Sequence, residues 1–244
     1  MHRFYADPVN SSEDSFVLSP EDTLHASKVL RMRPGDRAEV VFRGIRYLSA
    51  VGRISDNLAE LHPCEVLPST EPKLSLTLFQ GLPKSDKMDW IVQKATELGA
   101  VRIVPVAFSR CVVRLNDKEG AKKQERWQKI AREAGKQSGR CMIPEVAVPV
   151  PFRTLRDLFP SCGCVVVPWE ECCEGGPLAF RERHPDLSSA GIVIGPEGGI
   201  SPEEIREMSE WGAEPVTLGK RILRTETAGL AALSVFFGLY GDME

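Results

Sequence analysis

The sequence predicts an α/β protein with two domains, a small β-rich domain followed by a larger domain built on a parallel sheet. The first seventy residues contain short β-type runs broken by polar turns. Residues 68–72 contain two prolines and no apolar periodicity, which is typical of a linker. After the linker, strands alternate with helices, and this order indicates a parallel sheet covered on both faces. The predicted domains are therefore residues 1–72 and 73–244.

The amino-terminal domain begins with one short helix and continues with strands. The helix is expected at about residues 20–30, because Ser19 can cap it and Pro20 suits the first helical position. A turn at Pro34, Gly35 and Asp36 precedes the first of two β-type runs, at residues 37–42 and 46–51.

The larger domain is expected to contain five strands and four helices. Ser201, Pro202 and Glu204 form a capping box that begins one helix, and Gly212 can end it. The last helix is apolar nearly all round, so it should be buried. The strands are predicted at residues 74–79, 101–106, 164–167, 191–194 and 215–218, and the helices at 86–98, 120–137, 202–212 and 226–239.

The composition is that of a globular chain without a membrane segment. The 244 residues are 42% hydrophobic and 27% charged, which argues against wholesale disorder and low-complexity architecture. The longest apolar runs fall short of the roughly 18 residues that a membrane-spanning helix needs. The first residues lack the apolar stretch of a signal peptide. We therefore expect a cytoplasmic protein without membrane partners.

The seven cysteines are expected to be free thiols in a reducing compartment. Cys162, Cys164, Cys172 and Cys173 lie close together, but the spacing is not a common structural zinc pattern and no histidine lies between them. We expect no bound metal, and the role of these cysteines stays open. The histidines do not lie near serine or cysteine in a known nucleophile motif, so the sequence gives no support for triad chemistry.

The net charge of −3 hides two basic stretches. Residues 28–53 carry seven basic and two acidic side chains, and residues 102–140 carry eleven basic and four acidic ones. Local basic patches on a mildly acidic protein are typical of a protein with a polyanionic partner. Solvated helix and turn surfaces are the alternative explanation.

Two loops contain chemically unusual residues. Residues 195–199, Gly-Pro-Glu-Gly-Gly, lie between an apolar strand and the capped helix, and their backbone can approach a ligand closely. Residues 218–228 place a glycine, an apolar pair, an arginine, two hydroxyls and a carboxylate before the buried helix. Ligands bind at the carboxyl ends of the strands in such sheets. Neither loop contains the dinucleotide fingerprint or a Walker A motif.

Together the two loops resemble the SPOUT superfamily of RNA methyltransferases, and within it the RsmE family of 16S rRNA (uracil(1498)-N3)-methyltransferases. Weaker matches extend the resemblance over almost the whole chain, at residues 2–4, 29–31, 35–36, 84, 87, 94–99, 133–134, 137–138 and 140. The resemblance implies a PUA-like β-barrel joined to a SPOUT domain with a carboxy-terminal trefoil knot. It also implies a homodimer that binds S-adenosyl-L-methionine and acts on 16S ribosomal RNA of the small ribosomal subunit.

The resemblance also implies which residues bind the cofactor. The glycine-rich turn and the loop before the last helix would enclose it, and the loop after the third strand, which is the least family-like, would close a third side. The residues carried over are Val167, Pro168, Gly195, Pro196, Glu197, Gly198, Gly199, Leu218, Gly219, Ile222, Leu223, Arg224, Thr225, Thr227 and Ala228.

Methylation of uracil N3 requires removal of an imide proton and an in-line approach to the methyl group. Glu226 is the candidate proton acceptor, and Arg224 and Arg110 are the candidate cations. Glu226 could instead stabilise the first helical turn, with Arg224 as its structural partner. The candidate RNA-binding residues are Arg3, Arg31, Arg33, Lys84, Lys87, Arg110 and Arg140. Two alternatives stay open, namely methylation of another RNA atom such as a ribose 2′-hydroxyl, and a non-catalytic RNA-binding module.

Overall fold

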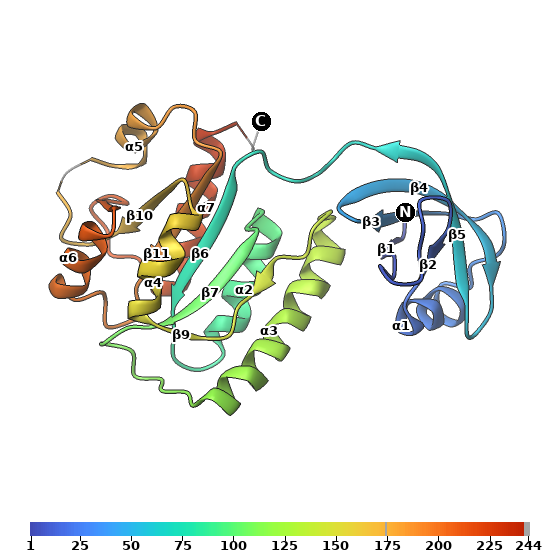
Figure 1. Cartoon of the computed structure of the whole chain (residues 1–244), viewed down its shortest axis with the longest axis horizontal. Coiled ribbons are helices and arrows are strands. Elements are labelled where there is room, and N and C mark those ends of the chain that lie inside the picture. Colours follow the sequence, from blue (N-terminus) through green and yellow to red (C-terminus); the bar gives the residue numbers. More distant parts are fainter. Residues whose placement is uncertain (174, 242–244) are drawn as a thin grey trace. The chain divides into compact units, whose positions relative to one another are not determined.

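The computed structural model describes residues 1–173 and 175–241, and these form two compact units (Figure 1). The first unit comprises Met1–Glu71 together with Lys136–Met142. The second comprises Pro72–Gly135 and the described residues from Ile143 onward. No helix in these two described stretches is long and apolar enough to cross a membrane.

The first unit is a curled five-stranded sheet with the order β1-β3-β4-β5-β2. β1 pairs with β3 in parallel, and the other pairs are antiparallel. A bridge between Ala6 and Leu18 joins the ends of the two outer strands, so the sheet closes on itself. This closure confirms the predicted barrel-like domain. The strands are β1 (Arg3–Tyr5), β2 (Phe16–Val17), β3 (Arg37–Phe42), β4 (Ile45–Ile54) and β5 (Ala59–Leu67).

Helix α1 (Pro20–Leu24) begins where the sequence predicts, because the Ser19 side chain accepts a hydrogen bond from the Asp22 N–H at 3.2 Å. The chain then continues as a π-helical turn, η1 (His25–Val29), in place of a single α-helix to residue 30. The aromatic rings of Phe16 and Tyr47 pack with their centroids 4.9 Å apart in the small core of this unit.

The second unit contains a seven-stranded sheet in which every recorded pairing is parallel. Its order is β12-β10-β11-β6-β7-β8, and β9 also pairs with β7. This confirms the predicted parallel sheet. The strands are β6 (Ser75–Gly81), β7 (Arg102–Ala107), β8 (Glu145–Val146), β9 (Val150–Pro151), β10 (Cys164–Pro168), β11 (Ser189–Ile194) and β12 (Ala213–Val216).

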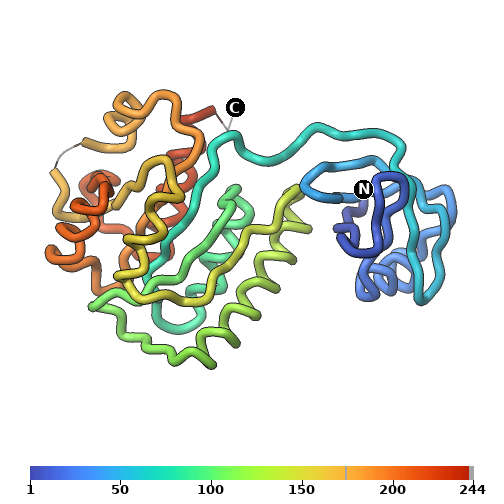
Figure 2. The backbone as a smooth tube through the Cα atoms, viewed as in Figure 1, coloured from blue at the N-terminus to red at the C-terminus, as the bar shows by residue number. Residues whose placement is uncertain are grey.

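Opposite faces of this sheet are buried by different elements. α7 (Thr225–Leu239) packs on β6 and β11, and α2 (Lys87–Leu98) and α5 (Pro177–Arg183) pack against α7. Figure 2 shows that α7, at the carboxy-terminal end, lies beside β6, which comes much earlier in the chain. On the other face, Phe79 meets Phe159 at 5.6 Å between ring centroids, and Phe159 meets Trp211 at 6.1 Å. The remaining helices are α3 (Asp117–Ser138), α4 (Leu155–Leu158) and α6 (Pro202–Glu210), with 3₁₀ turns η2 (Phe152–Thr154) and η3 (Phe159–Ser161).

Helix α6 and strand β12 show where local signals succeed and fail. The capping box of Ser201 and Glu204 is present, and α6 begins at Pro202 as predicted. The helix ends at Glu210 with Trp211 as its C-cap, and Gly212 follows with φ of +93°, as expected of a glycine that ends a helix. β12 occupies residues 213–216, two residues before the predicted strand, because it pairs with β10 from Ala213 onward.

Candidate active site

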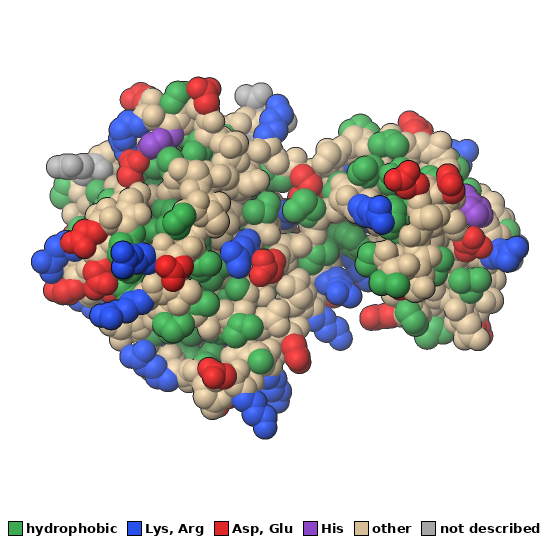
Figure 3. Space-filling model, viewed as in Figure 1, with side chains coloured by type: hydrophobic (Ala, Val, Ile, Leu, Met, Phe, Trp, Pro, Cys, Tyr) green, Lys and Arg blue, Asp and Glu red, His purple; other side chains and the backbone are tan. Residues whose placement is uncertain are grey.

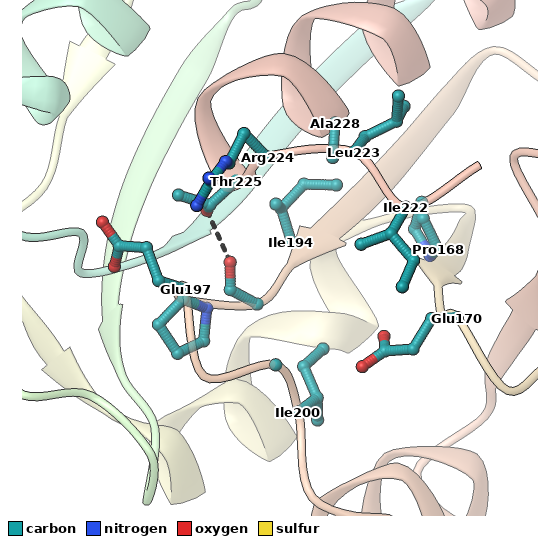
Figure 4. Close-up of a pocket in the computed structure, with 13 residues that line it drawn as sticks. Pro168, Glu170, Ile194, Glu197, Ile200, Ile222, Leu223, Arg224, Thr225 and Ala228 are labelled. Carbon is teal, nitrogen blue, oxygen red and sulfur yellow. Dashed lines mark hydrogen bonds between the residues drawn. The ribbon is translucent and has the colours of Figure 1, made fainter.

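Three loops at the carboxyl ends of β10, β11 and β12 surround a pocket of about 380 Å³ (Figure 4). This volume lies within the range of about 300–1,000 Å³ that is usual for small-molecule sites. The lining residues are Pro168, Glu170, Ile194, Gly195, Pro196, Glu197, Gly199, Ile200, Ile222, Leu223, Arg224, Thr225 and Ala228.

The glycine-rich turn after β11 is shaped by glycine in two ways. Gly199 has φ of +71°, and a Cβ atom there would lie 2.8 Å from Glu170 Oε1 across the pocket. A Cβ atom on Gly195 would lie 2.7 Å from Ile200 Cγ1, so the turn also folds tightly on itself. The Gly199 N–H donates to the Pro196 carbonyl at 2.9 Å, which closes the turn. The backbone therefore forms one wall of the pocket.

A buried polar chain joins this turn to the start of α7. The Gln80 amide Nε2 donates to Thr225 Oγ1 at 2.8 Å, and the Thr225 hydroxyl donates to the Gly195 carbonyl at 2.6 Å. Gln80 and Thr225 are both buried. Hydrogen bonds among buried groups are costly to break, so this series of hydrogen bonds fixes the positions of two walls of the pocket relative to each other.

Lys87 forms ion pairs with two carboxylates beside the pocket. Its Nζ atom lies 3.1 Å from Glu197 Oε1 and 3.2 Å from Glu226 Oε2. Glu197 also accepts a hydrogen bond from the Lys84 backbone N–H at 3.1 Å. Partial burial acts to raise the pKa of Glu197, but hydrogen bonds from its own backbone, from Lys84 and from Lys87 outweigh burial and hold that pKa below its usual value. The bonds to Glu197 and Glu226 raise the pKa of Lys87, so it stays cationic.

Two arginines flank the glycine-rich turn. Arg224 is exposed, lines the pocket and serves as the N-cap residue of α7. Arg110 is exposed, and its Nη1 atom donates to the Gly198 carbonyl at 3.3 Å. The loop that carries Arg110 is fixed by Glu204, a buried carboxylate that accepts a hydrogen bond from the Ser109 N–H at 2.7 Å. The two guanidinium groups therefore stand beside the turn on supported backbone.

The apolar walls of the pocket include one side chain that the fold does not bury. Ile222 is 86% exposed, and Figure 4 shows it with Pro168 on the opposite side of the pocket from Glu197. A smaller adjoining hollow of about 80 Å³ extends the site toward Leu218 and Gly219. Ile222 thus presents an apolar surface at the mouth of the pocket.

Most of the predicted cofactor-binding residues line these two hollows, namely Pro168, Gly195, Pro196, Glu197, Gly199, Leu218, Gly219, Ile222, Leu223, Arg224, Thr225 and Ala228. Val167, Gly198 and Thr227 are not among the lining residues. The side chain of Val167 is buried in the core, and Gly198 packs against Arg110.

Four side chains at the site carried no local signal in the sequence. Gln80, Ile194 and Ile200 lie next to the pocket only because their strands and turns meet in the fold. Glu170 follows β10 and turns its carboxylate toward the pocket (Figure 4). Their only indication in the sequence is that Ile194 and Ile200 directly flank the glycine-rich turn.

The candidate RNA-binding residues fall into two groups. Arg31, Arg33, Lys84 and Arg110 are exposed. Arg140 is 3% exposed and its guanidinium binds the Glu71 carboxylate, so a contact of Arg140 with RNA stays a prediction. Arg3 is similarly held by Glu39 with little of its side chain exposed, and Lys87 is engaged by the two carboxylates beside the pocket.

The cysteines that suggested zinc do not gather into a metal site. Among residues 1–173 and 175–241, no group of three or more histidine, cysteine, aspartate or glutamate side chains is arranged to hold a metal ion. Six of the thiols are free, namely Cys64, Cys111, Cys141, Cys162, Cys164 and Cys173.

The whole chain is similar to known proteins. The model of an RNA methyltransferase domain matches residues 70–237, and that of an RNA methyltransferase PUA domain matches residues 18–64. A ribosomal RNA small subunit methyltransferase E from Bacillus subtilis is 37% identical over 90% of this chain and 88% of its own length.

Solved structures agree with these matches. A ribosomal RNA small subunit methyltransferase E from Neisseria gonorrhoeae, bound to S-adenosyl methionine, is 34% identical, with a TM-score of 0.83 and full coverage of both chains. A methyltransferase from Legionella pneumophila, in complex with the same cofactor, is 31% identical, with a TM-score of 0.81 and coverage of 97% of this chain and 96% of its own.

Proposed function

The chain belongs to the family of the ribosomal RNA small subunit methyltransferases E, and from this premise we propose that it methylates uracil N3 in 16S ribosomal RNA. The methyl donor is S-adenosyl-L-methionine. The observation that carries the proposal is the pocket between the glycine-rich turn and the start of α7, with two arginines and a lysine–carboxylate cluster beside it.

The pocket fits this cofactor. Its volume of about 380 Å³ is within the usual range for small molecules. Gly195 and Gly199 leave backbone open to a ligand, and Ile222 and Leu223 offer apolar contacts for the adenine ring. When bound, the cofactor supplies a methyl group on a positively charged sulfur. We assign binding of the cofactor to the pocket-lining residues of the glycine-rich turn and of the loop before α7.

The protein's own part in the reaction is to orient the reacting groups and to manage one proton. The hydrogen-bonded chain from Gln80 through Thr225 to Gly195 fixes the two walls that hold the cofactor, and such positioning can supply much of the rate enhancement. Attack by uracil N3 requires loss of the N3 proton. We assign Glu226 as its acceptor, held in place by Lys87.

Loss of the N3 proton leaves negative charge on the uracil ring. A cation aimed at this charge lowers the barrier. Arg224 suits this role because it lines the pocket from the N-cap of α7 and is exposed toward an incoming base. Arg110, beside Gly198, is the second cation of the site.

Exposed basic side chains supply the contacts to RNA phosphates. In the first unit these are Arg31 and Arg33, within the PUA domain match. In the second unit, Lys84 and Arg110 lie next to the site, and Figure 3 shows further lysine and arginine side chains over α3. The exposed basic residues of α3 are Lys118, Lys122, Arg126, Lys129 and Arg132. Such contacts position an RNA without reading its sequence.

We further propose that the carboxy-terminal segment forms a trefoil knot and that the protein is a cytoplasmic homodimer. For the knot, the support is that β12 is an edge strand whereas α7, which follows it, packs on β6 and β11 in the middle of the sheet. For the dimer, the support is that α2 and α7 pack together and still expose Trp90 by 51% and Val235 by 41%. Large apolar side chains left exposed on adjacent helices are typical of interfaces.

Transfer of a labelled methyl group to small ribosomal subunits that lack the modification tests the proposal. The wild-type protein should label the RNA, and Arg224→Ala and Glu226→Gln should each lower kcat by about 100-fold or more, as loss of a charge-stabilising or proton-accepting group does. Arg156→Ala, which removes an exposed charge on α4, is the matched control and should retain kcat. Cofactor binding without transfer to any RNA would contradict the proposal.

A further inference from the structure

Outside the methyltransferase site, a cysteine, a histidine and a glutamate form a hydrogen-bonded series. Cys164 Sγ lies 3.3 Å from His184 Nδ1, and His184 Nε2 lies 2.6 Å from Glu214 Oε1. Cys164 begins β10, His184 follows α5, and Glu214 lies on β12. These residues belong to no recognisable nucleophile motif in the sequence, and Cys164 and Glu214 meet because β10 and β12 are neighbours in the sheet.

The arrangement fixes which histidine nitrogen can take a proton. The Glu214 carboxylate also binds Arg183 at 2.7 Å. Partial burial acts to raise the pKa of Glu214, but the hydrogen bonds from Arg183 and His184 outweigh burial and lower that pKa, so the group is ionised. An ionised carboxylate accepts a hydrogen bond from Nε2–H, which keeps the proton on Nε2 and leaves Nδ1 as the acceptor that faces the thiol.

We propose that Cys164 is a reactive thiol that undergoes exchange with small-molecule disulfides, with His184 as its base and Glu214 as the group that orients His184. The proposal is independent of methyl transfer. Thiol, imidazole and carboxylate in this order are the arrangement that activates a nucleophile in enzymes.

The exchange step balances without any further reactant. The Cys164 thiol proton moves to His184 Nδ1, and Sγ attacks one sulfur of the disulfide. A new S–S bond forms at Cys164 while the disulfide's own S–S bond breaks, and the departing thiolate takes the proton from His184. Cys164 is oxidised to a mixed disulfide and the departing sulfur is reduced to a thiol.

The surroundings explain why a base is needed. Burial, and next the charge of Glu214, raise the pKa of Cys164, so the resting group is a thiol. The other titratable and charged groups around the series are Arg183 at the end of α5, and Tyr240 after α7, whose hydroxyl donates to the His184 carbonyl at 2.8 Å. Arg181 stacks on the Tyr240 ring with its Cζ atom 4.8 Å from the centroid.

Cys162 is a matched control within the same chain. It is half-buried two residues away, and burial raises its pKa as well. Its hydrogen-bonding neighbours are Ser161 and Thr77, with no histidine among them. A difference in rate between Cys164 and Cys162 therefore reports the effect of His184 more than the effect of burial.

The test is the rate of modification of each cysteine by dithiodipyridine, a neutral disulfide, in the full-length protein, read by peptide mass spectrometry. At pH 7, His184→Gln should slow modification of Cys164 by about 100-fold, the lower end of what a positioned base supplies, and leave the rate for Cys162 within about twofold. Glu214→Gln, which keeps an acceptor but removes the charge, should slow Cys164 by a smaller factor.

The pH dependence adds a readout that a structural role would not produce. As the pH rises to 9, hydroxide ionises the thiol without help, so the gap between the wild-type protein and His184→Gln should narrow. An unchanged Cys164 rate in both variants would overturn the proposal, and so would equal slowing of Cys164 and Cys162. If His184→Gln lowers the unfolding temperature, the Glu214→Gln comparison decides by the same criteria.

Discussion

Replacement of Gly199 by alanine should lower both the stability of the protein, through backbone strain, and its affinity for the cofactor. A second glycine serves as a control that separates the two effects. Gly199 has φ of +71°, and a Cβ atom there would lie 2.8 Å from the Glu170 carboxylate inside the pocket. Gly212 is the matched control, because it has φ of +93° in the same unit and its Cβ atom would meet nothing within 4 Å.

The strain cost should be similar for the two variants. An alanine in the left-handed region costs about 1–2 kcal/mol. In a domain of this size, each kcal/mol lowers Tm by about 2–4 °C. We therefore expect Gly199→Ala and Gly212→Ala each to lower Tm by a few degrees in differential scanning calorimetry.

The cofactor affinity should differ between them. In Gly199→Ala the new methyl group and the displaced Glu170 carboxylate intrude on the pocket, so we expect the Kd for S-adenosyl-L-methionine to rise at least about tenfold, or 1.4 kcal/mol, in titration calorimetry. Gly212→Ala should keep the wild-type Kd. Equal affinities in both variants, or equal losses in both, would refute the assignment of this turn to the cofactor.

Further predictions concern an apolar contact and two titrating groups. Ile222→Ala should change the free energy of unfolding by less than about 0.5 kcal/mol, because the side chain is 86% exposed, yet weaken cofactor binding about tenfold. The control Leu178→Ala, 68% exposed on α5, should change neither quantity, and a destabilised but tightly binding Ile222→Ala would contradict the assignment. The folded protein lowers the pKa of Glu197, so the ionised carboxylate stabilises the folded state. This contribution to the free energy of unfolding is full above about pH 5 and is lost as the pH falls through and below 4.5. Urea unfolding of Glu197→Gln should then show a deficit at pH 7 that shrinks toward pH 3, and a deficit independent of pH would count against the ion cluster. Burial raises the pKa of Tyr5, whose hydroxyl donates to the Arg140 carbonyl at 2.8 Å. The contribution of the neutral Tyr5 phenol to the free energy of unfolding is therefore full below pH 10 and is lost above it. Tyr5→Phe should cost about 1 kcal/mol at pH 7, and its deficit should narrow above pH 10; a constant deficit would show that the phenol does not titrate as the structure implies.

The parts of the fold with local signals could be predicted from the sequence. The capping box at Ser201 and Glu204 and the left-handed Gly99, with φ of +116°, mark the start of α6 and the end of α2. Continuous apolar runs predicted β10 and β11, because strands that are buried on both faces of a sheet are apolar along their length.

The parts that depend on pairing between distant segments were not predicted. β1, β2, β8 and β9 are only two or three residues long and exist because a partner strand lies beside them. β12 was placed two residues too late, since its register comes from β10 and not from its own apolar residues.

The candidate site divides in the same way. The glycine-rich turn and the loop before α7 were found because their residues are unusual within a short stretch. Gln80 was missed because it lies within an apolar strand, and only the fold brings it to Thr225. The burial of Arg140 against Glu71 could not be predicted, because a count of charges in a sequence does not show which guanidinium groups are buried.

Analysis of the RNA nucleosides after methyl transfer shows whether the protein methylates uracil N3. Small ribosomal subunits that lack the modification are incubated with the protein and labelled S-adenosyl-L-methionine, and the RNA is then digested to nucleosides. We expect the label to appear in N3-methyluridine. Label in a 2′-O-methylated nucleoside would contradict the assigned target atom, and absence of both transfer and cofactor binding would contradict the enzyme itself.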